Sequence, residues 1–252
     1  MRSRFHDYQS SYPHARLTRS EDGVVEVTLH TGGESLRWNL DVHEELGNLF
    51  RDLANDRDNE VVILTGAGSH FTLPDAEAFS KLPPTDRERW DEIMLHAKDL
   101  MANYLDIQVP VISILNGPSG IHAELACLGD IVLASTEASA ADMGHFVYGI
   151  VPGDGVHVAW PMLIGLNHAR RFLLLGETLS ASELQDLGVV AEILERDQLM
   201  MRARELAETL LRQPRLTRRY TRQVLVGELR RRMLGELSLG LALEGITDLK
   251  AI

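Results

Sequence analysis

The chain has 252 residues, of which 44% are hydrophobic and 25% charged, an ordinary globular composition that argues against disorder. Its net charge of -12, from 25 basic and 37 acidic residues, disfavours nucleic acid and anionic membranes as partners. No stretch approaches the roughly 20 apolar residues of a membrane helix, the N-terminus lacks a signal-peptide core, and the single Cys127 cannot form an internal disulfide, so we expect a cytoplasmic protein.

The first half of the chain alternates predicted strands with predicted helices. Short apolar or alternating runs indicate the strands, and apolar positions spaced for one face indicate the helices. The expected strands are residues 16–18, 24–30, 61–64, 111–115 and 131–134. The expected helices are residues 40–56, 75–80, 86–105 and 124–128, the first capped by Asn39 or Asp41. An irregular arm is expected up to Pro13, and a Pro83-Pro84 break before the long third helix.

The second half is mainly helical. Helices are expected at residues 156–164, 166–175, 180–187, 196–211, 216–226 and 228–249, with a late strand at 188–194. Strands alternating with helices, followed by helices alone, predict an α/β core, residues 1–195, with a helical C-terminal region, residues 196–252. Eight arginines between Arg212 and Arg232 are interpreted as a solvated helix face or a subunit contact, in preference to an anion site.

The candidate chemistry lies between Asn116 and Gly155. Two glycine-rich turns each carry a histidine, His122 in N-G-P-S-G-I-H and His145 in M-G-H-F, and Asp154 follows in P-G-D-G. Glycine lets the backbone approach a ligand closely, and histidine transfers protons near neutral pH. Taken alone, Asp154 fits the cap of the next helix better than a catalytic carboxylate.

Other kinds of site are disfavoured by spacing. Two histidines and an aspartate suit zinc, but the chain has no H-E-x-x-H or similar ligand pattern, so no metal is predicted. Gly66 and Gly68 form too short a pair for a dinucleotide loop, and no acidic residue follows at the required distance. Cys127 lies in an apolar run and is expected to be a buried packing residue. No cofactor is predicted.

Several separated motifs, in the same order, resemble the crotonase (enoyl-CoA hydratase/isomerase) superfamily. They span roughly residues 24–213 and read V-V-I-L-T-G-A-G-S-H-F, V-P-V-I-S-I-L-N-G, A-E-L-A-C-L-G-D-I-V-L-A, Y-G-I-V-P-G-D-G and L-S-A-S-E-L-Q-D-L-G-V-V. The resemblance implies an α/β fold, a crotonase-like spiral of ββα units with a C-terminal α-helical region. It also implies that the helical region serves assembly into a homotrimer or a dimer of trimers.

Departures from the CoA-using members point to a subgroup. The glycine run of the oxyanion hole reads Gly120-Ile121-His122, Pro74 without an N–H stands in its other half, and His145 stands where hydratases commonly carry a glutamate. The sequence is similar instead to the β-diketone hydrolases typified by 6-oxocamphor hydrolase. These enzymes cleave a carbon–carbon bond between two carbonyls by a retro-Claisen reaction, without CoA. Their asparagine before the loop histidine is Ile121 here.

The resemblance to that subgroup implies catalytic roles. His145 is the base that activates water, with Asp154 as its orienting carboxylate. His122 and Trp38 donate hydrogen bonds to the oxyanion or enolate. Trp38 suits core packing equally well.

Three further residues are expected to contact the substrate. Glu244 lies in the late L-A-L-E motif, His43 on the first long helix, and Phe146 directly after His145. Glu244 suits a solvated helix face equally well.

Three functions remain open. The first is hydrolysis of a cyclic, apolar 1,3-diketone to a keto acid. The second is hydration or isomerisation of an acyl-CoA thioester, kept open by Glu124 near a position where the superfamily carries an acidic residue. The third is a non-catalytic scaffold of the crotonase fold.

Overall fold

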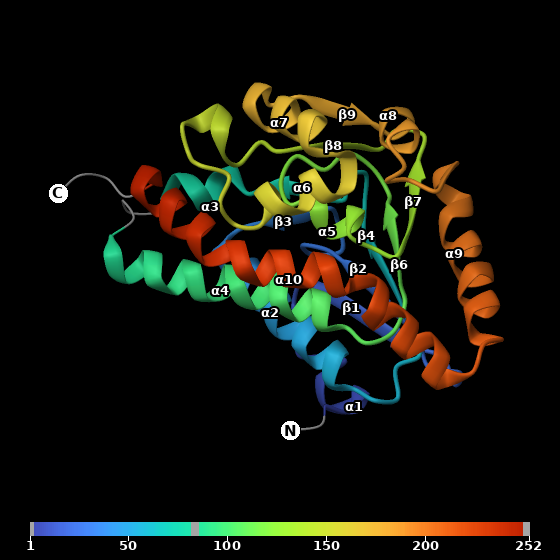
Figure 1. Cartoon of the computed structure of the whole chain (residues 1–252). Coiled ribbons are helices and arrows are strands. Elements are labelled where there is room, and N and C mark those ends of the chain that lie inside the picture. The colour runs from blue at the N-terminus through green and yellow to red at the C-terminus, as the bar shows by residue number, and fades with distance from the viewer. Residues whose placement is uncertain (1–2, 82–85, 249–252) are drawn as a thin grey trace.

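The computed structural model describes residues 3–81 and 86–248. These residues form an α/β fold in which helices pack around a six-stranded sheet (Figure 1). The strand order is β1-β2-β4-β6-β7-β10; β1 and β2 are antiparallel and all other neighbours are parallel. The strands are Ala15–Arg19 (β1), Val24–Leu29 (β2), Val61–Gly66 (β4), Val111–Leu115 (β6), Ile131–Ser135 (β7) and Glu192–Leu194 (β10). The predicted Pro83-Pro84 break lies outside the described residues.

Four strands of three residues form a second, smaller layer. They are Leu36–Trp38 (β3), Thr72–Pro74 (β5), Ser139–Ala141 (β8) and Thr178–Ser180 (β9). β3 pairs with β5 in parallel and β8 with β9 antiparallel, while Ser119 bridges Thr72 and Ala140 and so joins the two pairs. The chain therefore steps repeatedly from the large sheet to the small layer, from β2 to β3, β4 to β5, β6 to Ser119 and β7 to β8. This repetition is the predicted spiral of ββα units.

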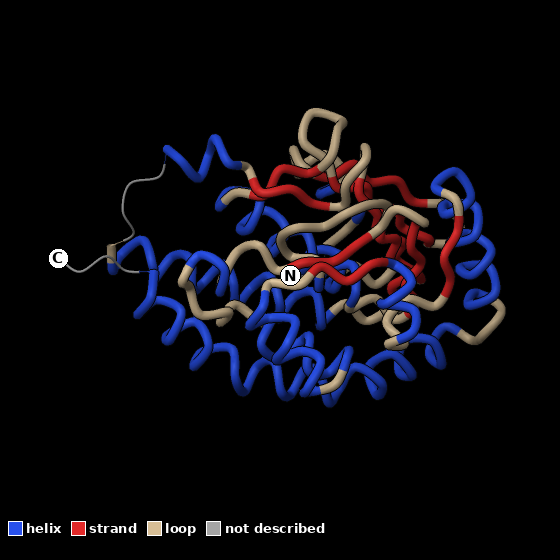
Figure 2. Tube along the Cα trace, turned by 90° about the horizontal axis from the view of Figure 1, so that it is seen from above, coloured by secondary structure: helices blue, strands red, loops and turns tan. Residues whose placement is uncertain are grey.

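Both faces of the large sheet are covered by helices, as its continuous apolar strands require (Figure 2). Side chains alternate along β4, so that Val61 and Ile63 face α9, whereas Val62 and Leu64 face the other side. The helices are Phe5–Tyr8 (α1), Leu40–Asn55 (α2), Ala76–Lys81 (α3), Arg87–Asp106 (α4), Glu124–Cys127 (α5), Val156–Ile164 (α6), Leu166–Leu175 (α7), Ala181–Asp186 (α8), Arg196–Leu211 (α9) and Arg215–Asp248 (α10). A 3-10 turn, Phe146–Tyr148 (η1), precedes α6. No helix in the described ranges is both long and apolar enough to cross a membrane.

Helix starts follow the predicted local chemistry. The Asn39 side chain accepts a hydrogen bond from the Val42 N–H at 3.0 Å and caps α2. Ser180 and Glu183 form a capping box on α8. Cys127 is buried as predicted, and burial raises the pKa of its thiol, which opposes a nucleophilic role.

Several predicted elements are wrong in extent. The two helices expected at 216–226 and 228–249 are one helix, α10, because Gly227 costs too little in an exposed helix to break it. The strand expected at 188–194 is only β10, and the arm before Pro13 contains the single turn α1. The strands of the small layer were not predicted, since three residues show no periodicity.

Three of the eight arginines that were predicted to form a solvated face or a subunit contact are instead buried within the chain, near the start of α10. Arg218, Arg219 and Arg222 are 8%, 1% and 2% exposed. The Arg222 guanidinium donates to Asp130 Oδ2 at 2.7 Å and to the Ile107 carbonyl, and Arg218 pairs with Glu60. These buried, charge-assisted contacts anchor the first half of α10 to the residues before β4 and β7 and to the loop after α4.

Candidate active site

A cavity of about 460 Å³ lies at the ends of the short strands, between them and helices α2, α4 and α10. Most of its wall is apolar, formed by Phe79, Trp90, Ile93, Ile121, Tyr148 and Leu241. Five ionisable side chains that lie close together line it, His43, His122, His145, Asp154 and Glu244, and Arg89 and Asp248 line it as well. An apolar hollow with a few convergent polar groups is the usual form of a small-molecule site.

The small layer explains why residues distant in sequence meet at this cavity. Trp38 pairs with Pro74, Thr72 with Ser119, and Ser119 with Ala140, all in parallel. Parallel strands leave a sheet at the same edge, so the residues that follow these positions arrive side by side. Trp38, Pro74, His122 and His145 therefore all reach the cavity.

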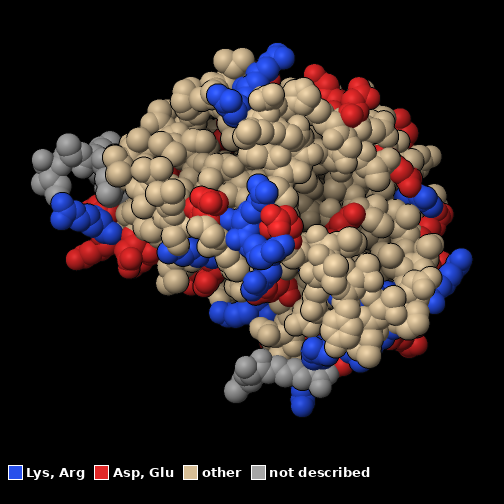
Figure 3. Space-filling view, viewed as in Figure 1, with Lys and Arg blue, Asp and Glu red and all other residues tan. Residues whose placement is uncertain are grey.

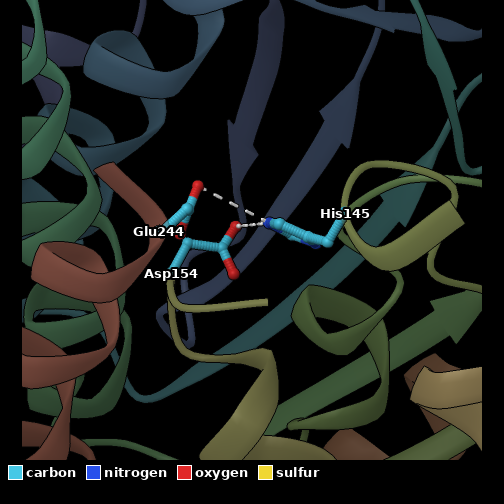
Figure 4. A group of neighbouring side chains, drawn as sticks. All are labelled: His145, Asp154 and Glu244. Carbon is cyan, nitrogen blue, oxygen red and sulfur yellow. Dashed lines mark ion pairs between the residues drawn. The ribbon is translucent and has the colours of Figure 1, made fainter. Parts of the chain in front are cut away.

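His145 is held by three carboxylates. Its Nδ1 lies 2.7 Å from Asp142 Oδ1, and its Nε2 lies 3.4 Å from Asp154 Oδ2 and 3.8 Å from Glu244 Oε1. Figure 4 shows the imidazole directed at Asp154 and Glu244, which come from the loop before α6 and from α10. The histidine is 7% exposed, so these contacts are shielded from bulk water.

His122 has a closely similar arrangement. Its Nδ1 lies 2.8 Å from Glu124 Oε1, and its Nε2 lies 3.8 Å from Asp154 Oδ2. The Trp38 ring stacks on the imidazole with centroids 3.9 Å apart and planes 34° apart. His122 has a φ of +50°, a left-handed conformation that histidine tolerates better than most residues. This turn aims the side chain into the cavity.

Asp154 contacts both histidines and the start of the next helix. One oxygen, Oδ2, faces both histidines, while Oδ1 accepts the Val156 N–H at 3.5 Å near the start of α6. Glu244 is bound to the residue before Asp154, because its carboxyl group accepts the Gly153 N–H at 3.2 Å. Gly153 and Gly240 pass so closely that a Cβ on either would overlap backbone atoms of the other. That approach brings α10, and with it Glu244, to the site.

The histidines are biased towards the charged form. Burial lowers the pKa of His145, but Asp154 and Asp142 outweigh it and hold the pKa well above its ordinary value of 6.5. Burial likewise lowers the pKa of His122, but the Glu124 carboxylate outweighs it and the pKa is raised. Asp154 is buried, yet the two histidines keep its pKa below the ordinary value of 3.8.

Two neighbours are biased towards the neutral form. Burial, reinforced by the charge of Asp154, raises the pKa of Glu244 to about 9. The charge of His145 lowers the pKa of Glu244, but the two groups are 3.8 Å apart and this effect does not offset the other two. Burial, reinforced by His122, lowers the pKa of His43 to about 3.

The cavity contains six of the seven predicted site residues: His145, Asp154, His122, Trp38, Glu244 and His43. Phe146 is the exception and does not line the cavity. Its side chain is 48% exposed and lies outside the cavity wall, because the 3-10 turn that begins with it reverses the chain, and Tyr148 lines the cavity instead.

Sequence reasoning missed Asp142 and left Glu124 without a contact. Both are buried, at 6% and 2% exposure, and each binds a histidine Nδ1. Both could have been found from the sequence, because each is a carboxylate two or three residues from a candidate histidine.

His145, Asp154 and Glu244 form the one group among the described side chains whose nitrogen and oxygen atoms lie within 4.8 Å of one another as metal ligation requires. Proton sharing accounts for the same contacts. The contacts of His145 Nδ1 with Asp142 and of Glu244 Oε2 with the Gly153 N–H are compatible with either reading, because His145 Nε2 and Glu244 Oε1 stay available. Chelation, described below, tests the metal alternative.

Comparison with known proteins agrees with the fold. The family model for enoyl-CoA hydratase/isomerase matches residues 19–241. The chain therefore belongs to the enoyl-CoA hydratase/isomerase family, and the predicted membership of the crotonase superfamily is confirmed. It is a crotonase-family enzyme.

Particular relatives differ in what they act on. A β-diketone hydrolase from the cyanobacterium Anabaena, solved with (S)-3-oxocyclohexyl acetic acid, is 42% identical with a TM-score of 0.92, covering 96% of both chains. An enoyl-CoA hydratase/isomerase from Mycobacterium paratuberculosis is 26% identical with a TM-score of 0.85, covering 94% of both chains. The 1,2-epoxyphenylacetyl-CoA isomerase of Escherichia coli is 27% identical over 79% of this chain and 76% of its own.

Proposed function

We propose that this protein is a β-diketone hydrolase that cleaves a carbon–carbon bond between two carbonyls, without CoA. The observation that carries the proposal is the pair of buried histidines, His145 and His122, whose Nε2 atoms face one Asp154 oxygen at 3.4 and 3.8 Å. Cleavage needs one group that takes a proton from water and another that holds the negative charge of the oxyanion and enolate. Two histidines that share the Asp154 carboxylate can supply the base and the hydrogen-bond donor.

The roles are divided by the neighbours. His145, which has no aromatic ring stacked on it among the described residues, takes the proton of a water molecule, and the water oxygen bonds to a carbonyl carbon. His122 lies against the Trp38 ring face, which favours an imidazolium, and donates from Nε2 to the developing oxyanion or enolate. Collapse of the tetrahedral intermediate breaks the bond between the two carbonyls and leaves a carboxylic acid and an enolate.

The substrate is an apolar cyclic diketone. Most of the other lining residues of the cavity are aromatic or aliphatic, with Arg89 and Asp248 among them. The ligand in the Anabaena enzyme is a cyclohexanone with an acetic acid side chain. Joining its carboxyl carbon to the ketone's distant α-carbon gives a bicyclic 1,3-diketone, so that ligand has the structure of a cleavage product.

A CoA-thioester reaction is the alternative that the relatives suggest. The acidic residue that kept it open is Glu124, and its carboxylate is bound to the His122 Nδ1 and lies outside the cavity wall. It is therefore not free to act on a substrate. His145 occupies the other position where hydratases carry a glutamate.

The test compares bicyclic 1,3-diketones with crotonyl-CoA and follows the loss of each. We expect turnover of a diketone alone, and a loss of at least ~100-fold in rate in His145→Ala, the usual size of a general-base effect. Turnover of crotonyl-CoA alone would refute the proposal, and turnover of neither would favour a scaffold.

The same assay after dialysis against EDTA tests the metal alternative. We expect the rate to be unchanged, because proton transfer by His145 requires no metal. A loss that added zinc restores would reassign His145, Asp154 and Glu244 to a metal site.

A further inference from the structure

Each histidine of the site has its own carboxylate on Nδ1. Asp142 lies three residues before His145, and Glu124 lies two residues after His122, so both pairs are set by the local chain. The Nδ1–carboxylate distances are 2.7 and 2.8 Å, the shortest contacts that either imidazole makes in the described structure. Five side chains therefore alternate in the order Asp142, His145, Asp154, His122, Glu124.

Asp154 is consequently on the reacting side of both rings. An imidazole whose Nδ1 donates to a carboxylate presents Nε2 to whatever lies beyond it. Both Nε2 atoms point at the single atom Asp154 Oδ2. Asp154 therefore cannot orient His145 in the way that the aspartate of a serine-protease triad does, because that aspartate binds the nitrogen that does not react.

Asp142 has no other apparent task. It is 6% exposed and does not line the cavity, and its Oδ2 has no hydrogen-bond partner in the described part of the chain. Its Oδ1 receives the His145 Nδ1 and, at 3.4 Å, the Gly144 N–H. Burying a carboxylate with so few partners is unfavourable, so the Asp142 contact with His145 is better explained by the reaction than by stability.

We propose that Asp142 is the positioning residue of His145, with Glu124 as its counterpart on His122, and this inference rests on the proposed function. Asp142 keeps the proton of His145 on Nδ1, so that the Nε2 lone pair is the one that takes the proton of water. That proton goes to Nε2, the water oxygen bonds to the carbonyl carbon, and the Nδ1 proton stays between the imidazole and Asp142. Asp154 then balances the positive charge on both rings.

The kinetic test uses Asp142→Asn beside the matched variant Glu124→Gln. The side-chain amide introduced by Asp142→Asn can donate to Nδ1 and so shift the ring proton to Nε2, which removes the base. We expect Asp142→Asn to lose at least ~100-fold in kcat with KM changed less than about threefold, since Asp142 lies outside the cavity wall. A variant that keeps kcat within about twofold of the wild type would overturn the proposal.

A titration of nitrogen-labelled histidines by NMR is independent of turnover. The charged groups facing His145 are Asp142, Asp154 and Glu244, with His122 beyond Asp154. Removing the Asp142 charge is expected to lower the pH at which His145 titrates, whereas Glu124→Gln shifts mainly His122. An unshifted His145 in Asp142→Asn would show a merely structural role, even if melting curves changed.

The two arms separate this inference from the proposed function. If the wild type cleaves no diketone, the proposed function fails, yet the His145 titration still reports whether Asp142 controls the imidazole. If the wild type cleaves diketones and Asp142→Asn melts normally with the wild-type rate, only the positioning role fails.

Discussion

At the scale of single residues, the chemistry of the site depends on which imidazole carries a proton. Both histidines have pKa values raised above 6.5 by their carboxylates, which biases both imidazoles towards the charged form. His145 acts as a base only after losing its Nε2 proton, whereas His122 donates only while it keeps its own. The working state is the one with His145 neutral and His122 charged.

A pH profile tests this state. Activity should rise as His145 deprotonates and fall as His122 deprotonates, and both limbs of the kcat/KM profile should lie above pH 6.5 because both pKa values are raised. A stopped assay across pH 5 to 10 at constant ionic strength measures it. An optimum below 6.5 would contradict the raised pKa values of the two histidines.

The raised pKa of Glu244 predicts how the stability of the fold depends on pH. Its pKa is 4.5 ordinarily and about 9 in the fold, so above pH 4.5 the unfolded chain loses a proton that the folded chain keeps. The stability present at low pH is therefore lost as pH rises towards about 9.

Glu244→Gln removes this penalty while its amide oxygen still accepts the Gly153 N–H. At pH 8 we expect the variant to melt at a higher temperature than the wild type, by the equivalent of a few kcal/mol, since each pKa unit is worth about 1.4 kcal/mol. At pH 4 we expect the variant and the wild type to melt at the same temperature. Thermal unfolding at the two pH values decides it. A variant that is less stable at pH 8 would show that Glu244 is ionised in the fold.

At the scale of elements, α10 extends from the beginnings of β4 and β7 to the candidate active site. Buried arginines hold its first half, and the contact of Gly240 with Gly153 places Glu244 one turn later beside Asp154. The helix is therefore part of the site and not an appendage, and its C-terminal half contributes Leu237 and Leu241 to the main core.

Gly240→Ala tests this connection. Its Cβ would overlap the Gly153 carbonyl and the His157 ring, so we expect destabilisation of about 1–3 kcal/mol and a lower kcat. Gly235→Ala, on the same helix with open space around it, is the matched control and should stabilise by up to about 1 kcal/mol. Denaturant unfolding compares the two. Equal effects would mean that the close approach does not matter.

The elements also show where sequence reasoning stops. Buried strands such as β4 and β6 were predicted because their apolar runs are long enough to identify. The strands β3, β5 and β8 were missed, yet their parallel register is what brings Trp38, His122 and His145 together. Spacing could suggest that His145 and Asp154 meet, but not that Asp142 takes Nδ1 and Asp154 Nε2, nor that Phe146 turns outwards, since these depend on backbone direction in short turns.

At the scale of the whole molecule, large apolar side chains are exposed on two helices, α10 and α7. Figure 3 shows basic and acidic groups mixed over the middle of one face, where α10 runs, and few charges above it over α6 and α7. Val224, Leu225 and Ile246 on α10 are 79%, 73% and 72% exposed, and Leu166 and Leu175 on α7 are 62% and 65% exposed. A monomer rarely leaves so many large apolar groups in water.

We therefore expect self-association, as a trimer or a dimer of trimers. Sedimentation equilibrium at micromolar concentration should give a mass of about 84 kDa, three times 28.1 kDa, or twice that value. Val224→Glu with Leu225→Lys keeps the net charge and is expected to weaken the assembly if this part of α10 is buried in it. A 28.1 kDa species throughout the concentration range would contradict the expectation.

The most direct measurement of the central claim is product analysis in water labelled with heavy oxygen. The protein is incubated with a bicyclic 1,3-diketone, without CoA, and the product is examined by mass spectrometry. We predict a single keto acid heavier than the diketone by one water, with one labelled oxygen in its carboxylate, formed by the wild type but hardly by His145→Ala. An unchanged diketone beside hydrated crotonyl-CoA would contradict the account.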